Sequence, residues 1–187
     1  LFLGPLLLLF LGLLLFGPAN RHTANDNTSG VVCVLETALA LPAELRSKVA
    51  FVLFDHEELG LFGSAGFAAK HPAARRDAFV LNLDCVCDGD AVLLALPRRC
   101  PPELYALLEA SFLPDGEKQV LLSRAGHTFY PSDQVSFRRG VAVAAFRRTR
   151  RGMLYLSRIH TARDTVFDVR NIVFIRGSLL RAAARLV

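Results

Sequence analysis

The chain has no charged residue before Arg21, no C-x-x-C pair among its four cysteines and no internal repeat. The missing cysteine pairs argue against a structural zinc module, which takes its thiolates at that spacing. The arginine pairs are not interleaved with aromatic residues and lie in no known nucleic-acid-binding motif, so we expect no nucleic-acid partner. Beyond the apolar N-terminus, the sequence indicates a single domain.

The uncharged N-terminal segment, residues 1–17, consists mainly of leucine and phenylalanine. As a helix it would be roughly 25 Å long, slightly shorter than the roughly 30 Å hydrocarbon core of a bilayer. Because the chain begins with Leu rather than Met, we interpret 1–18 as a transmembrane helix, or what an N-terminal truncation leaves of one. A signal peptide is the alternative, although the segment has no basic start and 17–20 is a poor cleavage site. We expect a membrane-anchored protein, with the number of spans and the side of the membrane open.

Basic residues exceed acidic ones, 22 against 17, which gives a formal net charge of +5. Much of the excess lies in arginine pairs. A solvated surface is one interpretation of these pairs, and attraction to anionic lipid beside the N-terminal segment is the other. The pairs are at 98–99, 138–139, 147–148 and 150–151.

Apolar runs and helix signals alternate along the rest of the chain. Short continuous apolar runs such as 48–54 are typical of buried parallel strands. The alternation predicts a three-layer α/β/α sandwich with a mixed, mostly parallel central sheet, so we expect one domain, 19–187, after the segment 1–18. Helices are expected at 29–40, 64–71, 101–112 and from 169 after an Asp168 cap, and strands at 48–54, 77–84, 91–96, 119–123, 141–146 and 153–157.

Acidic residues and one histidine lie at the ends of the expected elements. The strand that ends at Phe54 leads into 55–58, which contains two adjacent glutamates, and Asp84 ends the next strand. His160 follows the last strand, and Asp26 precedes the first helix. Each residue alone is typical of a loop, a turn or a cap, but ligands of open α/β sheets bind at the carboxyl ends of the strands. Carboxylates with a neutral imidazole suit zinc, and one of two adjacent glutamates can bind metal while the other accepts a proton.

Five motifs occur in order: "TANDNTSGV", "VAFVLFDHEELGLFGS", "NLDCVCDGD", "PSDQVSF" and "RIHTARDT". Together they resemble the zinc aminopeptidase family, metallopeptidase family 28, which includes bacterial leucyl aminopeptidases, glutamate carboxypeptidase, glutaminyl cyclases and the transferrin-receptor ectodomain. The resemblance extends from about residue 20 to residue 175. It implies a zinc site at the C-terminal ends of the strands, and together with the apolar N-terminal segment we expect a membrane-anchored, bacterial-type member.

The resemblance implies a role for each matched residue. Asp26 is similar to the carboxylate that bridges two zinc ions. Glu58 and His160 would complete the first zinc site, and Asp84 would bind the second zinc ion. Glu57 is similar to the general base that takes a proton from zinc-activated water.

Two substrate-binding residues and one uncertain ligand complete the implied site. Asp133, in "PSDQ", matches the family's "SD" dipeptide beside the substrate pocket, and Tyr130 would donate a hydrogen bond to the oxyanion. The family also supplies a histidine from an H-x-D motif upstream of the bridging aspartate, but here that region is apolar. His22 is the candidate replacement, with a linker histidine as the alternative. Without it the protein gives the second zinc only Asp26 and Asp84, so either one or two zinc ions are expected.

The resemblance implies zinc-dependent hydrolysis of peptide bonds, with removal of N-terminal residues by an aminopeptidase as the favoured activity. Two alternatives stay open: a catalytically inactive membrane interaction module and a single-zinc acyltransferase like the glutaminyl cyclases. The presence of both glutamates with Asp26, Asp84 and His160 argues against the inactive module. Cyclisation of an N-terminal glutamine would identify the acyltransferase. The sequence predicts neither the preferred side chain nor the oligomeric state.

Overall fold

The computed structural model describes residues 3–16, 20–124 and 128–186. Its first helix, α1, spans Leu3–Phe16. No helix in these ranges combines the length and the apolar character that crossing a membrane requires. The transmembrane span expected at 1–18 is therefore not supported, although positions 1–2 and 17–18 lie outside the described residues. Membrane attachment stays a prediction.

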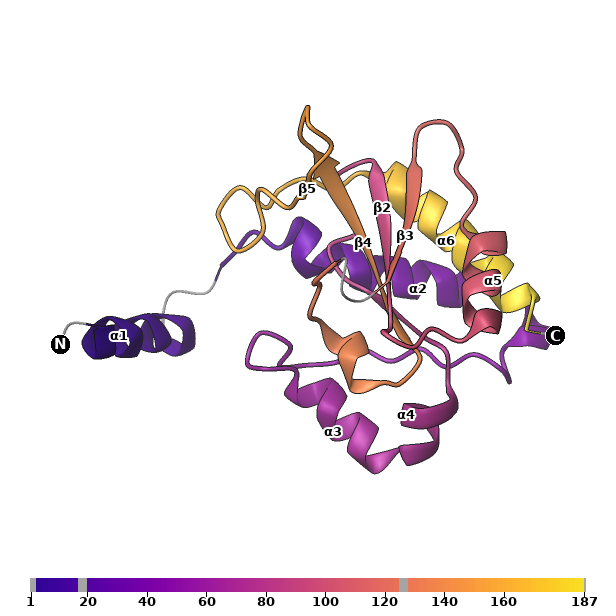
Figure 1. The fold of residues 1–187 in the computed structure, drawn as a ribbon, viewed down its shortest axis with the longest axis horizontal. Coiled ribbons are helices and arrows are strands. Elements are labelled where there is room, and N and C mark those ends of the chain that lie inside the picture. The colour runs from indigo at the N-terminus through magenta and orange to yellow at the C-terminus, as the bar shows by residue number, and fades with distance from the viewer. Residues whose placement is uncertain (1–2, 17–19, 125–127, 187) are drawn as a thin grey trace.

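The central sheet has the strand order β1–β4–β2–β3, with β5 beside β4 (Figure 1). β1 (Val80–Leu83) runs parallel to β4 (Gly140–Arg148), and β2 (Ala91–Leu96) runs parallel to β3 (Gln119–Arg124). β4 is antiparallel both to β2 and to β5 (Leu154–Tyr155), which is shorter than predicted. The sheet is flanked by helices, so the predicted α/β fold with a mixed sheet is confirmed.

The predicted helices are also present, within a few residues of their expected bounds. Asp168 caps the last helix as expected, because its Oδ1 accepts a hydrogen bond of 3.0 Å from the Arg170 N–H. After α1, the helices are α2 (Gly30–Ala40), α3 (Phe62–Lys70), α4 (Pro72–Asp77), α5 (Pro102–Ser111) and α6 (Val169–Ala184), and the short helical turns are η1 (Ala24–Ser29), η2 (Ala43–Leu45) and η3 (Asp133–Ser136).

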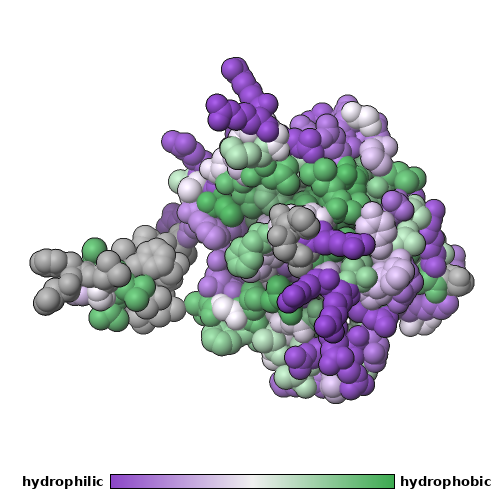
Figure 2. Space-filling view, viewed as in Figure 1, coloured by the Kyte–Doolittle hydropathy of each residue, from purple (hydrophilic) through white to green (hydrophobic). Residues whose placement is uncertain are grey.

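The core follows the two-residue period of the strands. Val92 and Leu94 of β2 lie in the main cluster, which includes side chains of α2, α5 and α6, whereas Ala91 and Leu93 lie in a smaller cluster on the other face. Figure 2 shows hydrophobic side chains at the surface over that second face. The packing of α2 against α6 and β1 brings the start of α2 next to the end of β1.

The strand predicted at 48–54 is wrong. Residues 49–54 form no ladder with any described strand, and Phe51, Val52 and Leu53 are 39%, 37% and 57% exposed. β1 is the last strand on this side of the sheet, and a groove of about 640 Å³ has lining side chains from both segments. An apolar run becomes a strand only where a neighbouring backbone completes its hydrogen bonds, and residues 49–54 form no such bonds with the free edge of β1.

Candidate functional site

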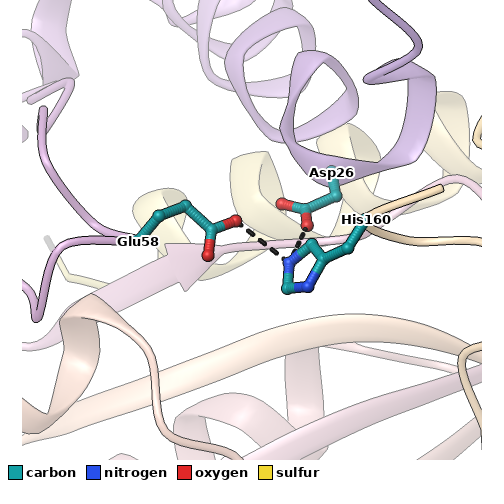
Figure 3. A group of neighbouring side chains, drawn as sticks. All are labelled: Asp26, Glu58 and His160. Carbon is teal, nitrogen blue, oxygen red and sulfur yellow. Dashed lines mark ion pairs between the residues drawn. The ribbon is translucent and has the colours of Figure 1, made fainter. Parts of the chain in front are cut away.

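Three side chains from distant segments meet beside the start of α2 (Figure 3). His160 Nε2 lies 2.9 Å from Asp26 Oδ2 and 3.0 Å from Glu58 Oε1. Asp26 belongs to η1, Glu58 to the loop before α3, and His160 to the loop after β5. One donor atom of each residue lies within 4.8 Å of the other two, so this first donor group is arranged to hold a metal ion.

A second donor group shares Asp26 with the first. It consists of Asp26, Asp84 and Cys85, whose donor atoms also lie within 4.8 Å of one another. Asp84 directly follows β1, at the edge of the sheet where ligands of such folds bind. Asp26 is thus shared by both groups, which is the position that a bridging carboxylate requires. The sequence did not indicate Cys85 as a member.

A buried carboxylate, that of Asp164, holds the backbone at Asp26 in place. Asp164 is 1% exposed, and its two oxygens accept hydrogen bonds from the backbone N–H groups of Asn25 (2.8 Å) and Asp26 (2.9 Å). Asp164 comes from the loop that also carries His160, so one loop supplies both a donor and the support of another donor. No sequence pattern indicated this role, although Asp164 lies inside the motif "RIHTARDT".

We expect Asp164→Asn to lower the free energy of unfolding by about 1–3 kcal/mol, because the buried pair of charge-assisted hydrogen bonds is replaced by one neutral bond. Urea unfolding of the purified variant measures this change. Asp115→Asn is the matched control: Asp115 also accepts two backbone N–H groups, from Glu117 and Lys118, but in an exposed turn. Equal losses in the two variants would contradict a special role for the buried carboxylate.

The asparagines on either side of Asp26 connect η1 to the segment that follows β1. Asn25 Oδ1 accepts a 2.7 Å hydrogen bond from the Cys87 N–H, and Asn27 Nδ2 donates a 3.0 Å bond to the Leu83 carbonyl oxygen. Gly30, at the start of α2, packs closely against the same groups. A Cβ atom at this position would collide with the Asn27 side chain and the Leu83 carbonyl oxygen. The polar residues on either side of Asp26 therefore hold its carboxylate in position.

Two members of the donor groups have a left-handed backbone. Cys85 has φ 55° and His160 has φ 59°. Such angles are uncommon outside glycine and are concentrated at functional sites, where the surrounding contacts hold them. Both residues therefore lie at points where the chain turns sharply to present a side chain.

Burial, together with a surplus of carboxylates around Asp26, changes two pKa values. Burial, reinforced by the negative charges of Asp84 and Glu58, raises the pKa of Glu57 to about 7. The same causes raise the pKa of Asp26 to about 6, against an opposing effect of His160. Glu57 belongs to neither donor group. The surplus of negative charge suits a divalent cation.

In the metal-free chain, the free energy of unfolding should fall as the pH rises from about 4 to about 7. A carboxyl group whose pKa is raised by folding holds its proton more tightly in the folded state. Its stabilisation is complete below the unfolded pKa and is lost as the pH passes the folded pKa. For Asp26 and Glu57 these limits are 3.8 and about 6, and 4.5 and about 7. Urea unfolding at several pH values, compared with Glu57→Gln, measures the effect; identical pH profiles of the two proteins would contradict it.

The remaining predicted site residues are Tyr130, Asp133 and His22, and none of them belongs to the two donor groups. Tyr130 donates a 3.2 Å hydrogen bond to the Asp84 carbonyl oxygen, and burial followed by the Asp84 charge raises its pKa well above the ordinary value. Asp133 is 7% exposed on η3, and its Oδ1 has no hydrogen-bond partner within the described ranges. Its charge is also among the causes that raise the pKa of Glu57. His22 is exposed, pairs its backbone with the Asn20 side chain, and belongs to neither donor group.

The family model described as "Peptidase family M28" matches residues 14–176. The crystal structure of the Legionella pneumophila LapA aminopeptidase matches with a TM-score of 0.64 and 17% identity, over 88% of this chain and 46% of that chain. An aminopeptidase from Aneurinibacillus sp. strain AM-1 matches with a TM-score of 0.59 and 22% identity, over 87% of this chain and 39% of that chain. These structures show a common fold, and this chain spans less than half the length of each. No curated protein sequence matches the chain.

Proposed function

Because the chain belongs to peptidase family M28, we propose that it is a zinc-dependent aminopeptidase that removes N-terminal residues from peptides. The observation that carries the proposal is the pair of donor groups that share Asp26, with the carboxylate of Glu57 beside them. The aminopeptidases with a similar fold support the choice of reaction.

The donor set fits zinc. Asp26, Glu58 and His160 would hold one ion through two carboxylates and an imidazole, with a position left for substrate or water, as in catalytic zinc sites. Asp26 and Asp84 would contribute to a second ion. When bound, zinc polarises the scissile carbonyl and makes water a stronger acid. The side chains of His160 and Glu58 are each 62% exposed, so a peptide can reach this edge of the site from solvent.

Glu57 is the general base of the proposed reaction. Its carboxylate accepts a proton from the attacking water and returns that proton to the leaving amine. A general base works best when its pKa lies near the working pH, and the burial of Glu57 raises its pKa above the ordinary value of a glutamate, towards neutral pH. The Glu57 carbonyl oxygen accepts hydrogen bonds from the N–H groups of Gly60 (3.0 Å) and Leu61 (2.8 Å), which fixes the loop that carries both glutamates.

The charges around the site favour a substrate with a free N-terminus. A peptide ammonium group would meet the carboxylates of the donor groups, and the charge of Asp133, which also acts on Glu57, would add to this attraction. The Tyr130 hydroxyl group, which donates a hydrogen bond to the Asp84 carbonyl oxygen in the free chain, would turn to donate to the developing oxyanion. These groups would orient the first peptide bond of the substrate.

An aminoacyl chromogenic substrate panel, with each member also in N-acetylated form, tests the proposal. With zinc present, we expect the purified chain to release the chromophore from the free aminoacyl compounds and to leave the acetylated ones intact. A chelator should abolish release, and added zinc should restore it. Cleavage of the acetylated compounds would contradict exopeptidase action. Cyclisation of a peptide with N-terminal glutamine, without release of an amino acid, would replace hydrolysis by acyl transfer.

A further inference from the structure

A cysteine lies where the second metal ion of the proposed site would need a further protein ligand. Asp26 and Asp84 would supply two donors to this ion, and His22 lies in neither donor group. The Cys85 Sγ lies within 4.8 Å of a carboxylate oxygen of each aspartate. The geometry points to Cys85 as the third protein ligand of the second zinc ion, in the role that an upstream histidine has in the family. The inference rests on the proposed function and extends its ligand set.

The backbone explains why consecutive residues serve one site. Along a strand, successive side chains point to opposite faces, so Asp84 and Cys85 would separate if β1 simply continued. The left-handed backbone at Cys85, φ 55°, ends the alternation directly after β1. The Cys85 N–H donates a 3.4 Å hydrogen bond to Asn27 Oδ1, from the residue next to Asp26. The same contacts that place Asp26 therefore also place the thiol.

Burial and charge at Cys85 also favour the binding of a cation at this position. The residue is 2% exposed and has a free thiol beside two carboxylates. His160 forms ion pairs with Asp26 and Glu58, whereas Asp84 has no ion-pair partner in the part of the chain that the structure describes. Partly buried carboxylates are costly without a compensating charge, and a zinc ion between Asp26, Asp84 and Cys85 would supply it.

The separations permit coordination after a small movement. With bond lengths of about 2.1 Å to oxygen and about 2.3 Å to sulfur, donors on a tetrahedral zinc ion lie roughly 3.6 Å apart. The three donor atoms, at most 4.8 Å apart, would need to approach by roughly 1.2 Å at most. A thiolate ligand would also favour zinc over magnesium or calcium, which prefer oxygen donors.

Cys87, two residues further along, provides the contrast. It is also buried and free, but its Sγ donates a 3.4 Å hydrogen bond to the Asp168 carbonyl oxygen, and it belongs to neither donor group. Cys33 lies in the main core cluster, and Cys100 packs against that cluster. Cys87→Ser is therefore the matched control for Cys85→Ser, because a serine hydroxyl group can keep the bond to Asp168.

Titration of the metal-free chain with Co²⁺ tests the proposal without any substrate. A cobalt–thiolate bond produces an intense near-ultraviolet charge-transfer band that oxygen and nitrogen donors do not produce. We expect this band to develop in the wild-type chain and in Cys87→Ser, and to be lost in Cys85→Ser. Absence of the band from the fully loaded wild-type chain would overturn the proposal, whether or not any variant folds.

Zinc content gives the second measurement. We expect Cys85→Ser to retain about one ion per chain, while wild type, Cys87→Ser and His22→Ala retain about two. Loss of an ion from His22→Ala but not from Cys85→Ser would assign the ligand to His22 and refute Cys85. A chain with the cobalt–thiolate band but no aminopeptidase activity would refute the proposed function and leave the ligand assignment intact. A chain with aminopeptidase activity and two zinc ions, but without the cobalt–thiolate band, would refute the ligand assignment and leave the proposed function intact.

Discussion

Glu57→Gln should lower kcat on the order of 10²–10⁴-fold and leave the zinc content unchanged. Glutamine keeps the size of the side chain but cannot accept a proton from water and return it to the leaving amine. Glu57 lies outside both donor groups, so its replacement removes no ligand. The change also removes a carboxylate whose negative charge is disfavoured in its surroundings, so the folded chain should not lose stability. Steady-state kinetics and elemental analysis on the same preparation measure both quantities.

Glu109→Gln is a suitable control, because Glu109 is exposed on α5, away from the donor groups. It should keep the wild-type rate and zinc content. A decrease in rate accompanied by loss of zinc in Glu57→Gln would mean that Glu57 is a ligand. A variant with substantial turnover would remove the general-base role, whatever its metal content.

The sequence predicted best those elements whose neighbours are within the described chain. The apolar run 91–96 is a strand between two others, and its alternating side chains fill both core clusters. The equally apolar run 48–54 lies beside β1 without a ladder. Both runs have the same local pattern, and they differ in whether their backbone pairs with the strand beside it. That information is tertiary and is absent from the hydrophobic period.

In the candidate site, too, some residues could be predicted from the sequence and others could not. The expected residues Asp26, Glu58 and His160 were identified from a resemblance of motifs, and they meet in the structure. Asp164 and Cys85 lie inside the same motifs but have no local pattern that marks a function. An aspartate near a threonine is typical of a turn, and a cysteine after a strand is typical of a core. Their positions depend on contacts across more than fifty residues, which no spacing rule contains.

Asp26→Asn should remove most of the bound zinc and lower the rate at least as far as Glu57→Gln. Asp26 belongs to both donor groups, so its replacement by a neutral, weakly ligating amide weakens both sites at once. The backbone should stay in place, because Asp164 binds the N–H of residue 26 and not its side chain. Glu58→Gln and Asp84→Asn each affect one group only, so each should lose about one ion.

The stability of the metal-free Asp26→Asn variant separates a lost ligand from a lost fold. Burial and the neighbouring carboxylates raise the pKa of Asp26 to about 6, so its charge opposes folding at about pH 8. A neutral amide removes this repulsion, and urea unfolding should show a metal-free variant at least as stable as the metal-free wild type. If the variant bound one zinc ion as tightly as wild type, Asp26 would serve a single ion. The two donor groups would then have to be treated as separate sites.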